Sequence, residues 1–225
     1  MNRRLRTQAT LRGTGRGGSS NPRAPSGYQV LAGWLARVAR FDFTVFDEVK
    51  EERTATASAV LVVLVSSLFA GLGTLFWSMQ HDFPGLDTAD VIVKAVIGGT
   101  IVQTGVFLAW VYLTHLLLVR AFGAEVLFQE LLRVMGLAFA PVALSIFVAI
   151  APLAVPFGVL SLSTAFLFSH IAVERISGVT TREASIANLG GFAAFLVFMG
   201  AFANVAEAGV FGGLAPGILF FSLDF

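Results

Sequence analysis

Five stretches without Asp, Glu, Lys or Arg constrain this chain more than any other feature. They cover residues 54–81, 95–119, 134–173, 184–206 and 208–223. A helix needs about 20 apolar residues to cross the hydrocarbon core of a bilayer, at a rise of about 1.5 Å per residue. The first, second and fourth stretches each fit one such helix, and the third is long enough for two helices joined by a tight turn.

The composition agrees with a membrane protein. Only 13% of the 225 residues are charged and 56% are hydrophobic, whereas a soluble domain carries about 25% charged residues. A disordered chain or a coiled coil would need far more polar residues. The absence of cysteine excludes disulfides, iron–sulfur clusters and thiolate zinc sites. We therefore expect an all-α integral membrane protein, a bundle of five transmembrane helices.

Two prolines, Pro152 and Pro156, fall near the middle of the long third stretch and favour a break there. The last stretch, 208–223, is rich in Gly and is poor material for an independent helix. It could extend the fifth helix, re-enter the bilayer or lie at the interface, and a sixth span is less favoured. The helices are predicted at roughly 56–79, 94–118, 133–151, 155–174 and 185–207.

The basic residues predict the orientation. Ten of the fifteen Lys and Arg residues precede the first span. Arg120 and Arg133 follow the second span, and Arg175 and Arg182 follow the fourth. Loops rich in Lys and Arg stay in the cytoplasm. We therefore expect a multi-pass protein with a cytoplasmic N-terminus.

The chain outside the spans divides into three further parts. Residues 1–27 carry six Arg and no acid among many Gly, Ser and Pro, which is typical of a disordered basic arm. In residues 28–53 apolar side chains recur at helical spacing, which predicts a cytoplasmic amphipathic helix with Trp34 at headgroup level. This segment could equally dock on the bundle's own loops. Residues 54–207 form the five-helix domain, and 208–225 form a Gly-rich apolar tail.

The predicted spans hold few groups that could carry chemistry. No nucleophile, metal-protease or phosphate-loop motif occurs, so we expect no catalytic residue and no metal site. His115 and His170 lie at the cytoplasmic ends of the second and fourth spans and could ligate a b-type haem. The favoured alternative is that each caps a helix, with His170 and Glu174 as an i,i+4 pair. On that interpretation the protein has no cofactor.

The segment FGAEVLFQELLRVMGLAFAPVALSIF, after the second span, resembles the Yip1 domain family at its third span. The residues that carry the resemblance are Gly123, Phe128, Glu130, Arg133, Gly136 and Pro141. The entry to the first span and the loop before the last are also similar to that family, so the resemblance covers about residues 38–207.

Several of these residues have a physical interpretation of their own. Gly123 permits a positive φ in a short turn. Glu130 and Arg133 are spaced as an i,i+3 ion pair. Pro141 is expected to kink its span. Gly191 belongs to a face of small residues that lets helices approach closely in lipid, a role that leaves oligomerisation open.

The resemblance implies a membrane partner protein. Eukaryotic members of the family bind small Rab-type GTPases in vesicle traffic. Arg outnumbers Lys thirteen to two, a usage that we associate with prokaryotic genomes, so the Rab partner is not carried over. A prokaryotic origin would place the protein in the cell's inner membrane.

The expected function is that of a non-enzymatic scaffold or accessory subunit acting through its cytoplasmic face. Its partners would be membrane lipids and an unidentified membrane or cytoplasmic protein, with no nucleic acid. A solute transporter or channel lined by Gln103, Asn188 and Asn204 is the alternative, and a haem-bearing redox subunit comes third. The predicted interaction face comprises Trp34, Phe46, Glu130, Arg133, Glu174 and Arg175.

Overall fold

The computed structural model describes residues 27–80 and 87–205, and this part of the chain is helical without strands. Five of its helical segments are long and apolar enough to cross a membrane, which confirms the all-α, five-span prediction. The segments are α3 (Ala55–Ser78), η1 with α5 (Ile92–Gly98 and Gly99–Phe122), α6 with η2 (Phe128–Ala138 and Ala140–Ala149), α7 (Ala154–Ser177) and α8 (Thr181–Val205).

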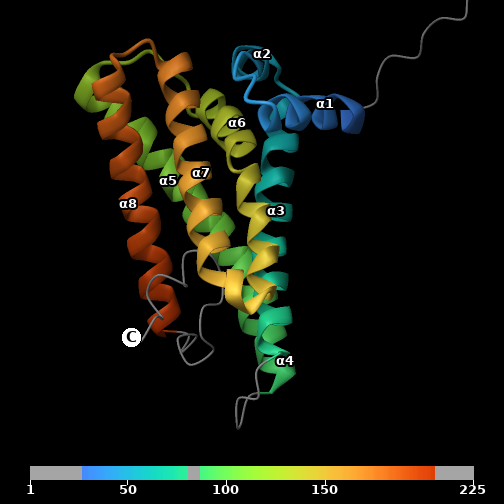
Figure 1. Ribbon diagram of the computed structural model, residues 1–225. Helices are drawn as coiled ribbons and strands as arrows, with labels where there is room; N and C mark the ends of the chain where they lie inside the picture. Colours follow the sequence, from blue (N-terminus) through green and yellow to red (C-terminus); the bar gives the residue numbers. More distant parts are fainter. Residues whose placement is uncertain (1–26, 81–86, 206–225) are drawn as a thin grey trace, which may run out of the picture.

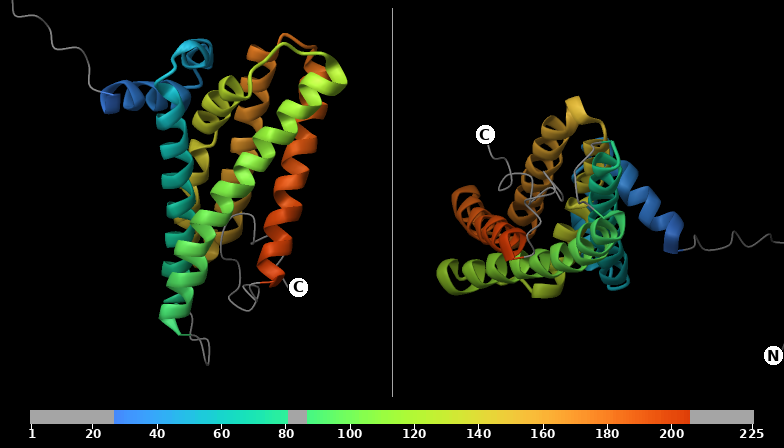
Figure 2. Two further views of the ribbon diagram at one scale, coloured as in Figure 1. Left: turned by 180° about the vertical axis from the view of Figure 1, so that it is seen from behind. Right: turned by 90° about the horizontal axis from the view of Figure 1, so that it is seen from below.

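Short helices mark the two ends of the bundle. At one end lie α1 (Gly27–Ala39) and α2 (Val45–Glu51), and α1 lies across the bundle beside the start of α3 (Figures 1 and 2). We call this the α2 end. At the opposite α4 end lies α4 (Thr88–Val91), and the 3₁₀ turn η3 (Ala151–Leu153) precedes α7. The predicted basic arm, except for its last residue, and the Gly-rich tail 208–225, for which a sixth span is the less favoured alternative, lie outside the described residues.

The third span changes its helix type halfway. Residues 128–138 are α-helical, and residues 140–149 form a 3₁₀-helix with Pro141 in its first turn. Proline lacks an amide hydrogen, and its ring collides with the carbonyl four residues earlier, so it disfavours continuation of an α-helix. Short 3₁₀ segments are usual and longer ones uncommon, so this half-span depends on its neighbours α3 and α7, against which it packs.

Glycines hold the spans at close distance. A Cβ on Gly73 would meet the backbone of η2 at the Ser145 carbonyl and, at 2.9 Å, at Ile146 Cα. A Cβ on Gly136 would lie 2.8 Å from the Ala59 side chain, and one on Gly191 would lie 2.7 Å from the Trp110 carbonyl oxygen. The helices approach this closely because dispersion contacts between packed backbones, rather than a hydrophobic drive, hold spans together in lipid.

Substitution of Gly73 should therefore be costly. Gly73→Ala places a methyl group against backbone that cannot rotate away, and overpacking of this kind costs about 1–3 kcal/mol. Gly105→Ala is the matched control, because nothing lies within 4 Å of its Cβ position. We expect a lower midpoint of thermal unfolding in detergent for Gly73→Ala and an unchanged or higher midpoint for Gly105→Ala. Equal midpoints would contradict the packing described here.

Candidate functional site

The α2 end gathers most of the charged side chains of the described chain. We define the α2-end face as α1, α2 and the connections 123–127 and 178–180, which all lie at this end of the bundle in Figure 1. Helix α2 packs on α6 and α7, and three of its side chains, Val45, Phe46 and Val49, are buried beneath it. The face therefore has an apolar underside and a polar outside.

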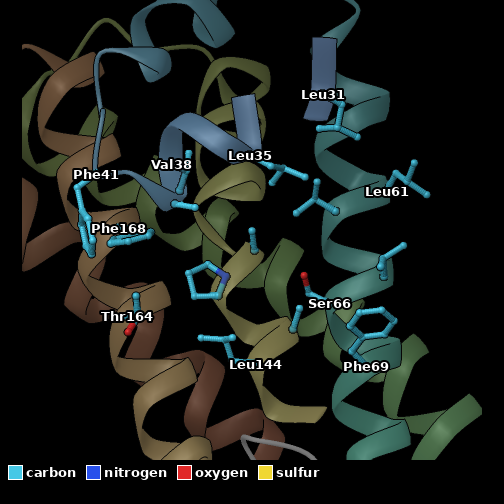
Figure 3. Close-up of a pocket in the computed structure, with 16 residues that line it drawn as sticks. Leu31, Leu35, Val38, Phe41, Leu61, Ser66, Phe69, Leu144, Thr164 and Phe168 are labelled. Atoms are coloured by element: carbon cyan, nitrogen blue, oxygen red, sulfur yellow. The ribbon is translucent and has the colours of Figure 1, made fainter. Parts of the chain in front are cut away.

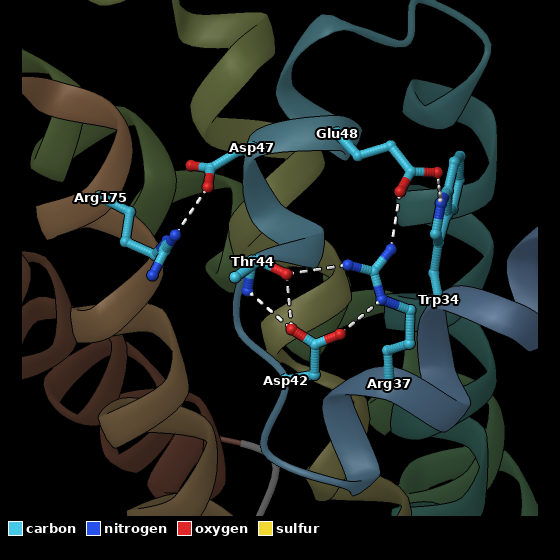
Figure 4. Close-up of polar contacts among 7 residues, drawn as sticks. All are labelled: Trp34, Arg37, Asp42, Thr44, Asp47, Glu48 and Arg175. Carbon is cyan, nitrogen blue, oxygen red and sulfur yellow. Dashed lines mark hydrogen bonds and ion pairs between the residues drawn. The ribbon is translucent and has the colours of Figure 1, made fainter.

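Arg37 joins α1 to α2. Its Nε donates to Asp42 Oδ2 at 2.8 Å, its Nη1 to Glu48 Oε2 at 2.7 Å and its Nη2 to Thr44 Oγ1 at 2.9 Å. Figure 4 shows the guanidinium reaching these three partners. The hydrogen bonds to Asp42 and then Glu48 raise the pKa of Arg37 above its ordinary value. Since its side chain is about a third exposed, solvent screens these ion pairs.

Two further contacts complete this network. Trp34 Nε1 donates to Glu48 Oε1 at 2.8 Å, and this bond, together with Arg37, lowers the pKa of Glu48. Thr44 Oγ1 donates to Asp42 Oδ1 at 2.5 Å. The bond from Thr44 and that from Arg37 lower the pKa of Asp42. The carboxylates of Asp42 and Glu48 are thus held in their charged forms.

Helix α2 is tied in turn to the spans. Arg175 Nη2 on α7 donates to Asp47 Oδ2 at 2.7 Å, and Lys50 Nζ donates to the Ile176 carbonyl at 3.3 Å. Arg133 on α6 donates from Nη1 to the Lys50 carbonyl at 2.7 Å and from Nε to Thr56 Oγ1 at 2.8 Å. Since Arg133 is only 7% exposed, its hydrogen bonds are the best shielded from water among these contacts.

The predicted interaction residues differ in how far they reach the surface. Trp34 is 5% exposed and Phe46 is fully buried, so both support the face from inside, and Trp34 bonds Glu48 rather than standing free at the surface. Glu174 is half-buried and accepts a hydrogen bond of 2.6 Å from Thr181 Oγ1. Arg175 is the exposed member, at the edge of the α2-end face.

Glu130 and Arg133 do not pair, contrary to the sequence prediction. Glu130 Oε2 accepts from the Leu127 amide at 3.1 Å, which caps the first turn of α6. Arg133 points instead to α2 and α3. A free amide at a helix start and two buried acceptors are better partners for these charges than an exposed i,i+3 ion pair. Gly123 has a φ of 68° and ends α5 in the left-handed conformation.

The two histidines have separate partners. His115 Nε2 lies 3.2 Å from the Val126 carbonyl oxygen. His170 Nε2 lies 3.8 Å from Glu174 Oε2. Among the described residues no group of three His, Asp or Glu could hold a metal ion. Each histidine therefore has a polar neighbour close by in sequence, a carbonyl of the connection before α6 for His115 and a carboxylate of its own helix for His170.

The polar residues of the spans have unequal surroundings. Asn188 is fully buried, and its Oδ1 accepts from Trp110 Nε1 at 3.1 Å while its Nδ2 donates to Ser169 Oγ at 3.2 Å. It therefore joins α5, α7 and α8. Gln103 is also fully buried, but neither side-chain polar atom has a hydrogen-bond partner in the described part of the chain. The side chain of Asn204 lies outside the described ones.

Sequence reasoning missed the centre of the α2-end network. Arg37, Asp42 and Glu48 are not among the predicted interaction residues. The spacing of Arg37 and Asp42 around a helix end was the available local signal. The Asp47–Arg175 pair spans 128 residues of sequence, and no pattern within a single sequence reports such a contact.

Comparison with known proteins gives one match. Residues 42–221 match the family described as the Yip1 domain. The matched region begins four residues later than the resemblance read from the sequence, and it extends beyond residue 207 into the Gly-rich tail. No curated protein and no solved structure matches the chain.

Removing the buried guanidinium should loosen α2. In Arg133→Met the Lys50 carbonyl and Thr56 hydroxyl lose their donor, and hydrogen bonds to a charged group contribute about 1.5–3 kcal/mol each. We expect a clear fall in the midpoint of thermal unfolding. Arg182→Met is the control, because Arg182 is exposed. A midpoint that falls equally in both variants would contradict the role of Arg133.

Acid should release α1 from α2. The pKa values of Asp42 and Glu48 lie below their ordinary values of 3.8 and 4.5. Their stabilising effect is thus full above those values and is lost as the pH falls through the lower values of the folded protein. Since the chain has no cysteine, a spin label on Tyr28→Cys reports α1 alone. We expect its mobility to rise below about pH 4.

The same label should behave differently once Arg37 is replaced. In Arg37→Gln, α1 has lost its ion pairs, so the label should already be mobile at pH 7 and should respond less to acid. Mobility that stays constant from pH 7 to pH 3 in the parent protein would show that these carboxylates do not hold α1.

Proposed function

The chain belongs to the Yip1 domain family, and on that premise we propose that it is a non-enzymatic scaffold or accessory subunit of a membrane assembly. It crosses the membrane several times. In this proposal the α2-end face binds a membrane or cytoplasmic protein partner, and no step of the function is catalytic.

The observation that carries the proposal is the preorganisation of the α2-end face. Arg37 joins α1 to α2, and Arg133 and Arg175 join α2 to α6 and α7. A surface assembled in advance from several helices loses little conformational entropy when a partner binds. A short segment held by so many side chains is better suited to recognition than to simply linking one span to the next.

The orientation of this face follows from the basic residues. Arg120, Arg133, Arg175 and Arg182 lie at or near the α2 end, whereas the α4 end offers Lys94 alone among the described residues. The positive-inside rule then directs the α2-end face to the cytoplasm. With a prokaryotic origin inferred from the arginine usage, the membrane would be the inner membrane.

Exposed charges on this face supply the chemistry of recognition. Glu51 ends α2 and Arg53 follows it, whereas Arg120 lies in the last turn of α5 and Glu125 in the connection before α6; all four are exposed. Leu127, on the same connection, is 66% exposed. Mixed charges around an apolar side chain favour a protein partner with complementary charges over a uniformly charged polymer.

Exchanging two of these charges tests the proposal. Glu51→Lys with Arg53→Glu inverts the local pattern without altering net charge or the buried side of α2. Affinity purification from native membranes should recover a partner with the parent protein and at least tenfold less with this variant. Thr88→Lys with Ala89→Glu, which adds a charge pair at the exposed α4 end, is the control and should leave recovery unchanged. Equal recovery from all three proteins would refute the proposal.

A solute transporter is the second candidate, and Gln103 is the observation that favours it. A buried amide without hydrogen bonds costs about 1–3 kcal/mol, and polar groups inside spans often mark transport paths. Asn188 contributes less to this candidate, because its hydrogen bonds already hold three spans together. Solute flux into proteoliposomes that Gln103→Leu abolishes would decide for transport, whereas the scaffold has no such flux.

A further inference from the structure

An apolar groove lies beneath α1 on the side of the bundle. Its volume is about 610 Å³, within the range of about 300–1,000 Å³ typical of ligand sites. Leu31, Leu35 and Val38 of α1 form its roof, and α3 and α7 form its walls. The floor is the 3₁₀ half of the third span, where small residues such as Ala140 and Ala143 leave the space unfilled. Figure 3 shows the side chains converging on this space from α1, α3 and α7.

The groove lies at the depth of acyl chains. Its lining on α3 runs from Leu61 to Phe69, which are about 9 Å and about 21 Å along the helix from its first residue at 1.5 Å per residue. The hydrocarbon core of a bilayer is about 30 Å thick, so the groove lies inside that core and extends from the leaflet on the α2 side to about the bilayer midplane. Only Ser66 and Thr164 contribute hydroxyl groups to its lining, so the groove offers few hydrogen bonds to water.

The surrounding lipid suits this groove better than the segments before α1 and after α8. The 26 residues before α1 include six Arg and few apolar side chains, a composition that does not suit an apolar groove. The residues after α8 follow a helix that ends at the opposite, α4 end of the bundle (Figure 1). The surrounding lipid is therefore the nearest source of long apolar chains.

A cation is adjacent in sequence to the lining of the groove. Arg40 is exposed and lies between Ala39 and Phe41, both of which line the groove. Its side chain forms no ion pair or hydrogen bond within the described residues, in contrast to that of Arg37, which is fully engaged. A guanidinium at this position complements a lipid phosphate.

A strained residue shapes the same end of the groove. Phe41 has a φ of 61°, in the left-handed region that costs a non-glycine residue about 1–2 kcal/mol. The Asp42 amide donates to the Arg37 carbonyl and the Phe41 amide to the Val38 carbonyl, each at 3.0 Å, a helix ending at which Gly is usual. The Phe41 ring, 68% exposed, rests on Phe168 with ring centroids 5.8 Å apart. Strain kept at an exposed aromatic residue indicates a function for its side chain.

We propose that the groove formed by α1, α3, η2 and α7 binds one acyl chain of an anionic phospholipid whose phosphate pairs with Arg40. Phe41 closes the end of the groove below that headgroup. The groove shares α1 with the α2-end face but opens on the side of the bundle, and its proposed occupant is a lipid whichever protein that face binds. A zwitterionic phospholipid would supply the same acyl chain but would gain less from Arg40, because its own ammonium group offsets the phosphate charge.

Fluorescence quenching in bilayers tests the site. Leu61→Cys carries an uncharged bimane fluorophore in the groove wall, and Leu189→Cys carries the same fluorophore on α8, outside the groove. The two leucines are similarly exposed, at 50% and 56%. The full chain is reconstituted in vesicles with equal amounts of phosphatidylglycerol and phosphatidylcholine, one of which carries bromine in the middle of its acyl chains. The measured quantity is the ratio of quenching by brominated phosphatidylglycerol to that by brominated phosphatidylcholine.

We expect this ratio to be about fivefold higher at Leu61 than at Leu189, the equivalent of about 1 kcal/mol for one basic residue near the headgroups. Arg40→Gln and Ala143→Phe should lower the ratio at Leu61 to that at Leu189, by removing the cation and by filling the groove. Ala193→Phe, at an exposed position of α8, should leave it unchanged. Phe41→Gly should lower the ratio without lowering the thermal midpoint, because the backbone strain is relieved.

Two results would overturn the proposal. Equal ratios at Leu61 and Leu189 would mean that the groove meets only bulk lipid. Absence of quenching by either lipid at Leu61, with normal quenching at Leu189, would mean that protein covers the groove, such as a second copy of this chain. Since Arg40 is exposed, Arg40→Gln tests the headgroup contact even where Ala143→Phe disturbs folding.

Discussion

The hydrocarbon interior of the bilayer offers no water to a charged or unpaired polar group, and this absence determines where this chain can place its charges. Backbone groups must bond within helices, and Asp, Glu, Lys and Arg must lie near the helix ends. Most of those in the described chain therefore crowd at the α2 end, close enough to bond one another. Arg133 is the clearest example. A guanidinium could not be buried without partners, but two hydrogen-bond acceptors on α2 and α3 allow its burial, and its bonds connect α6 to both helices.

The same solvent also explains the irregular third span. Helices in lipid gain nothing from hiding apolar side chains, so close backbone contact has to replace that gain. Gly73 and Gly136 bring α3 against η2 and α6, respectively. Pro141 ends the α-helix, and the 3₁₀ half that follows is narrower and carries small side chains toward α1. The groove is thus a consequence of the proline and the alanines around it, in a bundle that is otherwise tightly packed.

Five spans and the place of the turn at Pro152 could be predicted because each depends on a local property, the length of an uncharged run or the chemistry of proline. The hydrogen-bond partners of the side chains could not be predicted, because they lie on segments distant in sequence. The i,i+3 spacing of Glu130 and Arg133 is genuine, yet Lys50 and Thr56, more than seventy residues away in sequence, provide better acceptors. The burial of Trp34 could not be predicted either, because the apolar pattern of α1 suits contact with lipid and contact with protein equally well.

Helix α1 connects the two proposed sites. Arg37 faces α2 and the charged network, whereas Leu31, Leu35 and Val38, spaced at four and three residues, face the groove. Because α1 belongs both to the groove and to the α2-end face, a ligand at either site acts on the same helix. A lipid under α1 and a protein on the α2-end face would then each change the affinity of the other by the same factor, since coupling between two binding sites is reciprocal. The coupling is positive if the partner binds α1 in the position that closes the groove, and negative if it binds α1 in another position. Phe41, with its positive φ in the connection between α1 and α2, lies where the direction of α1 relative to α2 is determined.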